Sequence, residues 1–236
     1  MTAPIAFVCA MPMELRPLTK RLGLRKATVG GAELQVGTLG GREVVAIVTG
    51  MGTALATEGT ERLLAAVTPA RVVVFGITGA VEDETPIGTL MLPERVVHSE
   101  TGEEFRPAQL GDGTPSGTLW TTNVITPPHE LPALRAKGVV ALDMETAAIA
   151  KCCQARDIPW SVFRVISDRA SDGTVVEEVF EMSNQDGTPN PRRVVRYVLR
   201  HPHHVPRLAR MGRQAKLATE RAAEAAVAAL THVGGT

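Results

Sequence analysis

The chain is poor in several residue types on which specialised proteins depend. Aromatic residues make up only 3% of its 236 residues, too few to build the stacking platforms that bind single-stranded nucleic acid. The three cysteines, Cys9, Cys152 and Cys153, are odd in number and have no CxxC spacing, which argues against a disulfide framework or a zinc site. They are typical of buried thiols in a reducing cytosol, so we expect a cytoplasmic protein.

A charge imbalance and long hydrophobic runs are also missing. Lys+Arg and Asp+Glu residues number 25 each, so no overall field attracts the chain to nucleic acid or acidic lipid. No apolar run approaches the roughly 18–20 residues of a membrane span. With 44% hydrophobic and 21% charged residues, the composition is that of an ordinary globular enzyme. The sequence shows no linker or internal repeat, and we expect one domain over residues 1–236.

Short apolar segments alternate with helical patterns along the chain. Strands are predicted at residues 5–10, 34–39, 43–48, 71–75, 88–97, 119–125, 139–142 and 160–166, and helices after residue 12 and at 54–67, 127–137, 146–156 and 208–230. This alternation predicts an α/β fold around a mixed, largely parallel sheet. Its centre is the stretch from Leu142 to Asp168, a helix and a buried strand with acids at both ends.

Three acids follow predicted strands in widely separated parts of the sequence. Glu14, Glu145 and Asp168 each come just after such a strand, the last beside Ser167. Taken singly, each acid has a structural explanation at a helix N-terminus or a strand end. Ligands of open α/β sheets, however, gather at the carboxyl ends of the strands. Together the acids therefore predict one crevice with acid and base groups for a small substrate.

Two glycine-containing turns are predicted at the ends of other strands. Thr49 and Gly50 precede the helix at 54–67, and Thr78 and Gly79 follow the strand at 71–75. Glycine allows the backbone to approach a ligand closely, and a helix N-terminus suits an anion or a polar group. A plain tight turn explains the first motif equally well on its own. Because both turns end strands of the same sheet, we expect all four residues to contact the substrate.

The motifs AMPMEL, VTGMG, VVFGITGAV, PIGTLML, VALDMETAAIA and FRVISD occur in this order between residues 5 and 168. In this order the chain resembles the nucleoside phosphorylase/nucleosidase superfamily. It is most similar to 5′-methylthioadenosine/S-adenosylhomocysteine nucleosidases and to hopanoid-associated nucleoside phosphorylases. The strongest part of the match is the pair Asp143-Met144-Glu145 and Ser167-Asp168. The resemblance implies a three-layer αβα fold that cleaves an N-glycosidic bond.

The resemblance also implies roles for individual residues. Glu14 matches the acid that activates the attacking water. Glu145 matches the acid that hydrogen-bonds the ribose hydroxyls, with Met144 packed against the sugar. Asp168 matches the acid that protonates N7 of the purine, and Ser167 helps to place it. These residue types suit a reaction in which positive charge develops on the sugar and negative charge on the departing base.

The attacking nucleophile is the first open question. Phosphorolytic relatives carry an arginine just before the glycine turn, whereas this sequence reads VVVFGITG there. Because a dianionic phosphate needs cationic donors, water is favoured. Arg16 and Arg42 keep phosphorolysis open. The sequence thus predicts a nucleosidase for a 5′-substituted adenosine, with a phosphorylase, including the adenosyl-hopanoid type, as the alternative.

A non-catalytic nucleoside-binding module is a further alternative, although the three retained acids argue against it. A dinucleotide-binding protein is disfavoured because no GxGxxG motif follows a predicted strand. We expect a small-molecule nucleoside as the partner. Phosphate is a second partner if the enzyme is a phosphorylase. We expect no nucleic acid, cofactor or metal. The resemblance implies at least a homodimer.

Three regions carry no assigned role. Within the region 98–126, residues 101–126 do not align with the family. Residues 98–117 are predicted to form a long loop or an irregular hairpin, which is either a lid or binding loop or a disordered segment. The sequence His201-Pro202-His203-His204 lacks nearby carboxylate or cysteine ligands and is interpreted as solvated surface. The helix at 208–230 is basic in its first part. Its mainly alanine apolar face is too weak for interfacial anchoring, so it is expected to pack against the domain.

Overall fold

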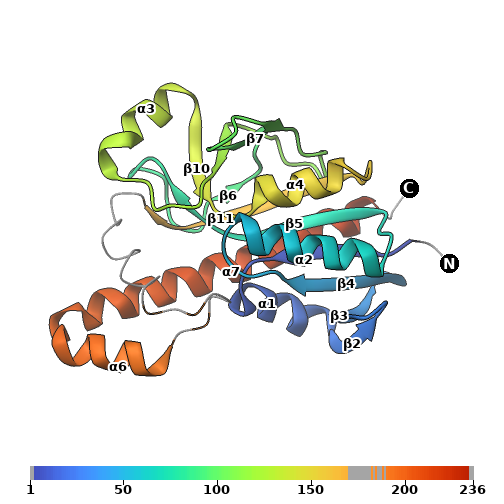
Figure 1. Cartoon of the computed structure of the whole chain (residues 1–236), viewed down its shortest axis with the longest axis horizontal. Helices are drawn as coiled ribbons and strands as arrows, with labels where there is room; N and C mark the ends of the chain where they lie inside the picture. Colours follow the sequence, from blue (N-terminus) through green and yellow to red (C-terminus); the bar gives the residue numbers. More distant parts are fainter. Residues whose placement is uncertain (1–2, 170–181, 183, 185–187, 189, 234–236) are drawn as a thin grey trace.

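The computed structural model describes residues 3–169, 182, 184, 188 and 190–233. Its strands are β1 Ile5–Cys9, β2 Arg25–Val29, β3 Ala32–Leu39, β4 Arg42–Val48, β5 Arg71–Ala80, β6 Leu90–Met91, β7 Arg95–His98, β8 Glu104–Phe105, β9 Thr118–Thr121, β10 Val139–Asp143 and β11 Trp160–Arg169. They form one sheet in the order β2-β3-β4-β1-β5-β10-β9-β7-β8, and β11 pairs with β5 and β6 (Figure 1). The central strands β4, β1, β5 and β11 are parallel, whereas β10 meets β5 in the antiparallel sense. The predicted mixed sheet is confirmed.

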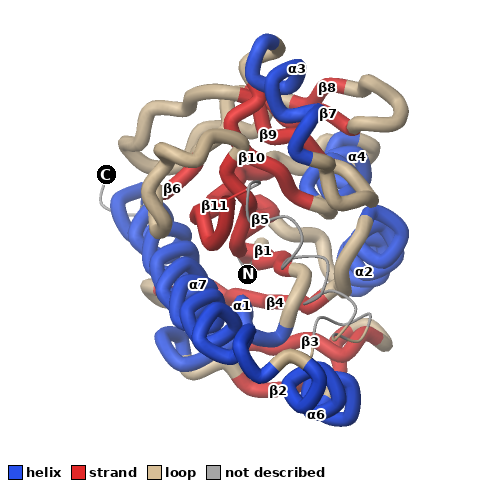
Figure 2. The backbone as a smooth tube through the Cα atoms, turned by 90° about the vertical axis from the view of Figure 1, so that its left-hand side faces the viewer, coloured by secondary structure: helices blue, strands red, loops and turns tan. Residues whose placement is uncertain are grey.

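Helices cover both faces of this sheet. They are α1 Pro12–Leu22, α2 Thr53–Ala66, α3 Leu131–Ala136, α4 Thr146–Gln154, α6 Pro191–Arg200 and α7 Val205–Val233, with short 3₁₀ turns η1 Pro128–Glu130 and η3 Pro202–His204. Figure 2 shows α1 and α7 on one face and α2 and α4 on the other. Two apolar clusters fill the interfaces between the three layers. The αβα architecture is confirmed. None of the described helices is both long and apolar enough to cross a bilayer.

Strand β5 changes partners along its length. Residues Arg71–Val74 pair with β1, and only Gly79 and Ala80 pair with β10, while β11 follows the other edge. Between Val74 and Gly79, this edge of β5 therefore faces neither β1 nor β10. Backbone groups in such a gap need other partners, because a buried N–H or C=O without a hydrogen bond is costly. The gap lies where the acids were expected to meet.

One predicted turn and one predicted strand end are wrong. Residues 76–79 were expected to form a turn after a strand ending at Phe75, but β5 continues to Ala80. Ser167 and Asp168 were expected beyond the strand end, but they lie within β11. The two extensions pair with each other, so tertiary pairing overrides the turn preference of glycine.

Other element boundaries also differ from the prediction. The strand predicted at 88–97 is divided into β6 and β7, the strand at 119–125 ends at Thr121, and β2 and β8 were not predicted. Pro93 lies between β6 and β7, as expected for a residue that cannot donate to a ladder. Residues 194–199 are a short apolar run of the sequence, and they belong to α6. The buried alanines of α7 confirm that its second half packs against the sheet.

Candidate active site

A cavity of about 620 Å³ lies at the carboxyl ends of the central strands. Seven of the nine residues predicted for the site line it: Glu14, Thr78, Gly79, Met144, Glu145, Ser167 and Asp168. They come from the start of α1, from β5, from the β10–α4 junction and from β11. Much of the remaining wall is apolar and includes Ile125 and, on α7, Leu208 and Met211. The cavity therefore combines several acidic side chains with a largely apolar wall.

Glu14 occupies the gap along β5. Its Oε1 accepts a hydrogen bond of 2.8 Å from the amide of Ile77, and its Oε2 accepts bonds of 2.9 Å from the amides of Ala10 and Met11. Gly76 makes this position available, because a Cβ at residue 76 would lie 2.2 Å from Glu14 Oε1. Backbone groups at the end of β1 and in the middle of β5 thus fix the carboxylate.

The buried side chain of Arg164 contacts three of the acidic residues. Only 1% of this residue is exposed. Its Nη2 donates to Asp143 at 2.6 Å and to Glu145 at 3.2 Å, and its Nη1 lies 3.8 Å from Glu14. Nη1 also donates to the carbonyl of Ile77, which fills another hydrogen-bonding position in the gap along β5. One buried guanidinium therefore holds three carboxylates around the cavity.

Asp143 and Glu145 have different surroundings although they are close in sequence. Asp143 accepts hydrogen bonds from the Thr121 hydroxyl and from the amide and hydroxyl of Thr146, which leaves it committed to the start of α4. Glu145 accepts from the amide of Gly52 at 3.0 Å and otherwise contacts Arg164. Glu145 therefore retains more capacity to bind a ligand.

Burial dominates the electrostatics of the acids. It raises the pKa of Glu14 above the ordinary value, and the lowering effects of Arg164 and of three backbone amides do not fully offset it. Burial also raises the pKa of Glu145 to about 7, with Arg164 opposing and Asp143 adding to the increase. Burial disfavours the charge of Arg164, but the adjacent carboxylates raise its pKa overall. Both glutamates are thus better proton acceptors than exposed carboxylates.

A β-bulge places the last acid. The register of β11 against β5 shifts between Ile166 and Asp168, so Ser167 is an extra residue and Asp168 lies opposite Gly79. A Cβ at Gly79 would be 3.1 Å from Asp168 Oδ2. The Ser167 hydroxyl donates to Asp168 Oδ1. Bulges commonly re-aim a side chain beside an active site, and here the bulge and the glycine together fix the carboxylate at the cavity.

Thr49 and Gly50 do not line the cavity. The Thr49 amide bonds to the carbonyl of Cys9, and its side chain packs against Gly59 of α2. Met51 lines the cavity instead, and the Gly52 amide holds Glu145. Met51 and Gly52, instead of Thr49 and Gly50, are therefore the residues of this segment that contribute to the site.

The sequence reasoning assigned no role to Arg164 or to α7. A lone arginine in an otherwise apolar buried strand was the available signal for Arg164, because a buried charge requires partners. No comparable signal existed for α7, whose Leu208, Met211 and Ala215 line the cavity. Arg16 and Arg42, the arginines considered for phosphate, do not line it, whereas Arg169 does.

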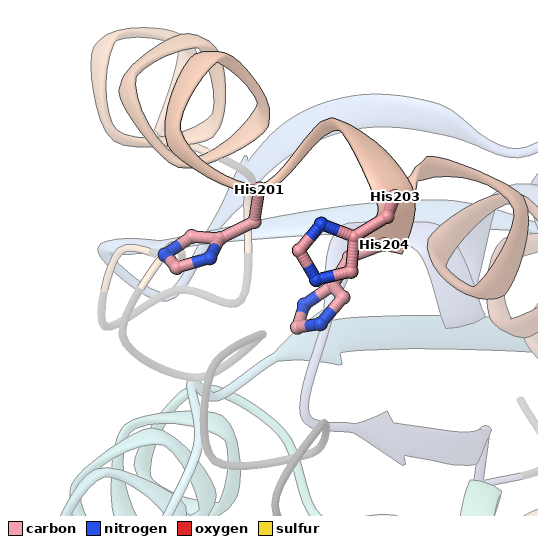
Figure 3. Close-up of side chains that lie close together, drawn as sticks. All are labelled: His201, His203 and His204. Atoms are coloured by element: carbon pink, nitrogen blue, oxygen red, sulfur yellow. The ribbon is translucent and has the colours of Figure 1, made fainter.

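The histidines at 201–204 form a separate cluster. Ring nitrogens of His201, His203 and His204 lie within 4.8 Å of one another at the turn between α6 and α7, outside the cavity (Figure 3). His201 and His204 stack at 5.4 Å between centroids, and Tyr197 hydrogen-bonds His204. This proximity was not expected from the sequence. The absence of a metal stays a prediction.

Comparison with known proteins adds to this geometry. A sequence model of the phosphorylase superfamily matches residues 4–115 and 108–200. A 5′-methylthioadenosine/S-adenosylhomocysteine nucleosidase of Bacillus cereus is 26% identical over 198 residues, which cover 70% of this chain and 86% of the relative.

Solved structures share the fold at low sequence identity. The nucleosidase of the same name from Neisseria meningitidis, solved with methylthio-immucillin-A, has a TM-score of 0.74 at 16% identity and covers 98% of this chain and 99% of its own. Futalosine hydrolase of Helicobacter pylori has a TM-score of 0.73 at 14% identity and covers 99% of each chain.

Proposed function

The chain belongs to the phosphorylase superfamily and is an enzyme of N-glycosidic bond cleavage, and we propose that it is a purine nucleosidase for a 5′-substituted adenosine. The reaction would release the free base and a ribose derivative. The observation that carries the proposal is that Glu14, Glu145 and Asp168, from three distant parts of the chain, line one cavity. This arrangement also argues against a non-catalytic binding module, since binding alone does not require three buried or half-buried acids.

Each acid has a task that its surroundings support. Water attacks C1′ of the ribose and passes a proton to Glu14, whose raised pKa suits a general base near neutral pH. The C1′–N9 bond breaks, and its electron pair leaves with the base. Asp168 donates a proton to N7 of the departing purine, which lowers the cost of that step. Such acid–base catalysis typically contributes ~10²–10⁴-fold.

Glu145 binds the sugar. It accepts hydrogen bonds from the ribose hydroxyls, and its negative charge stabilises the oxocarbenium-like transition state, as in other glycosidic cleavages. Met144 packs against the ring. Arg164 does not need to touch the substrate, because its role is to hold Glu14, Asp143 and Glu145 in place.

Water is favoured over phosphate by the charge of the site. The buried guanidinium of Arg164 is shared among three carboxylates. A dianionic phosphate near these acids would meet repulsion and find no uncommitted donor on Arg164. Phosphorolysis is retained as a second candidate because Arg169 also lines the cavity. The apolar wall formed by α7 supports an apolar 5′ group.

The test is to incubate the protein with methylthioadenosine, adenosylhomocysteine, adenosine and inosine, with and without phosphate, and to measure free base. We expect adenine release from a 5′-substituted adenosine at a rate independent of phosphate. Base release that strictly requires phosphate, and that is lost in Arg169→Gln, would instead establish the phosphorylase. Ligand binding without base release from any nucleoside would refute the enzyme assignment for these substrates.

A further inference from the structure

Positive charge is concentrated in one segment of a neutral chain. Residues 190–219 contain seven arginines and one lysine but no aspartate or glutamate, although the whole chain has 25 residues of each sign. This segment comprises α6, the turn η3 and the first half of α7. Five of its arginines are exposed and make no ion pair within the described residues: Arg192, Arg196, Arg200, Arg210 and Arg213.

Apolar side chains are exposed between these charges. Val195 is 58% exposed and Leu199 is 77% exposed, and helix α6 has no buried residue. At 100° per residue, Val195 and Leu199 form a strip directly beside the row Arg192, Arg196 and Arg200. Val205 and Leu217 on α7 are each 41% exposed. Leu199 is the most exposed large hydrophobic side chain of the described residues.

Helix α6 and the first half of α7 form a hairpin that extends away from the sheet. Figure 1 shows both helices at one end of the molecule, with their connecting turn farthest from the sheet. The more central half of α7 is different, because Ala218, Ala222 and Ala226 are fully buried there. The hairpin is thus free to meet a flat partner without unfolding the core.

We propose that the α6–α7 hairpin is a docking surface for an anionic lipid bilayer. Arginines beside an apolar strip suit the membrane interface, where the apolar side chains enter the acyl boundary and the guanidinium groups reach the headgroups. Charge complementarity identifies the partner as negatively charged. Each basic residue near such a surface contributes about 1 kcal/mol, or about fivefold, to binding.

The exposed apolar strip distinguishes lipid from nucleic acid. A nucleic acid would bind the arginines through its phosphates. It would also need aromatic side chains on which its bases stack. Tyr197 is the sole aromatic residue of α6, and its ring lies against His201 and His204. Exposed valine and leucine at i and i+4 gain free energy from an acyl boundary and little from a phosphate backbone.

Docking would also place the catalytic cavity at the bilayer. Leu208 and Met211 line the cavity from one side of α7, whereas Arg210 and Arg213 are exposed on another side of the same helix. The inference does not depend on the reaction proposed for the cavity, since it rests only on the outer residues of the hairpin.

The test is co-sedimentation of the full chain with vesicles of phosphatidylcholine alone or with added phosphatidylglycerol. We expect binding only to the anionic vesicles, with a loss of at least about tenfold when the salt concentration rises from about 50 to 500 mM. The variant R192Q/R196Q/R200Q should bind at least tenfold more weakly, and V195S/L199S several-fold more weakly. The triple variant R25Q/R62Q/R106Q, which removes the same charge from exposed sites elsewhere, should bind like the parent.

Three results would overturn the proposal. The first is no binding to anionic vesicles by a folded chain. The second is equal weakening by the matched triple variant, which would indicate general electrostatics. The third is unchanged vesicle binding in V195S/L199S together with tighter binding to duplex DNA, which would identify the hairpin as a nucleic-acid surface. Circular dichroism of each variant confirms that the helices are intact.

Discussion

Glu14 Oε1 lies 3.8 Å from Arg164 Nη1, and each residue is only 1% exposed. The attraction lowers the pKa of Glu14, but burial is the larger effect and the net shift is upward. Arg164 therefore holds the Glu14 carboxylate in position, and Glu14 is still a stronger base than an exposed glutamate. Four predictions follow from this relationship and from the contacts around it.

Gly76→Ala should reduce base release by ~10²-fold or more, because the new Cβ would lie 2.2 Å from Glu14 Oε1 and displace the general base. Steady-state kcat/KM on a 5′-substituted adenosine measures this. Gly40→Ala is the matched control, since Gly40 also has a positive φ but a Cβ there meets nothing within 4 Å. Alanine rarely adopts the backbone angles of either glycine, φ 150° at Gly76 and φ 57° at Gly40, and each substitution costs on the order of 1–3 kcal/mol. An equal activity loss in both variants would therefore contradict the proposed contact.

Asp168→Asn should abolish base release while nucleoside binding persists. Asparagine keeps the shape of the side chain but cannot give a proton to N7. Isothermal titration with a non-hydrolysable nucleoside analogue measures binding, and adenine release measures turnover. Asp83→Asn, in an exposed loop, is the control for the loss of one acid. Normal turnover in Asp168→Asn would remove this residue from the mechanism.

The rate should fall on the acid side with a midpoint above 4.5, the ordinary value for glutamate, because the pKa of Glu14 is raised and only its ionised form accepts the proton. The pH dependence of kcat/KM measures this midpoint. The pKa of Glu145 is about 7, so this residue also titrates above 4.5. The residual activity of Glu145→Gln should therefore retain an acid limb due to Glu14. Loss of the limb in that variant would assign it to Glu145.

Glu145 should make the fold less stable as pH rises. Its pKa is raised from 4.5 to about 7 in the folded protein, so the folded state binds more protons between these values. The stability it contributes is complete below pH 4.5 and is lost as pH rises through 7, by up to ~3 kcal/mol. Urea unfolding at pH 5, 6, 7 and 8 should show this decline relative to Glu145→Gln. Parallel curves for the two proteins would contradict it.

The acids were predictable from sequence because each follows a short apolar run, although Asp168 proves to lie within β11. That pattern also predicted the mixed sheet and the αβα layers. The helix N-termini after Met11 and Glu145 had clear signals, since Pro12 and a run of alanines follow. Pairing between distant strands was not predictable. The extension of β5 to Ala80 depends on β11, and no local preference of its glycines indicates it.

Positions within the site depended on side-chain contacts that no local pattern specifies. Thr49 was expected at the ligand but packs against Gly59, and Met51 lines the cavity instead. The bulge at Ser167 inserts one residue, and a strand pattern with a period of two cannot locate such an insertion. Helix α7 lines the cavity because of its crossing over the sheet, which is a property of the whole fold.

The hydrogen bond from the Ile77 amide to Glu14 has a spectroscopic consequence. Regular positions of a sheet donate to a backbone carbonyl, which does not titrate, whereas this amide donates to a carboxylate that does. Its proton chemical shift should therefore move when Glu14 gains a proton, and its exchange with solvent should quicken. A single resonance in a ¹⁵N-labelled sample would then report the ionisation of the general base, with or without a ligand in the cavity.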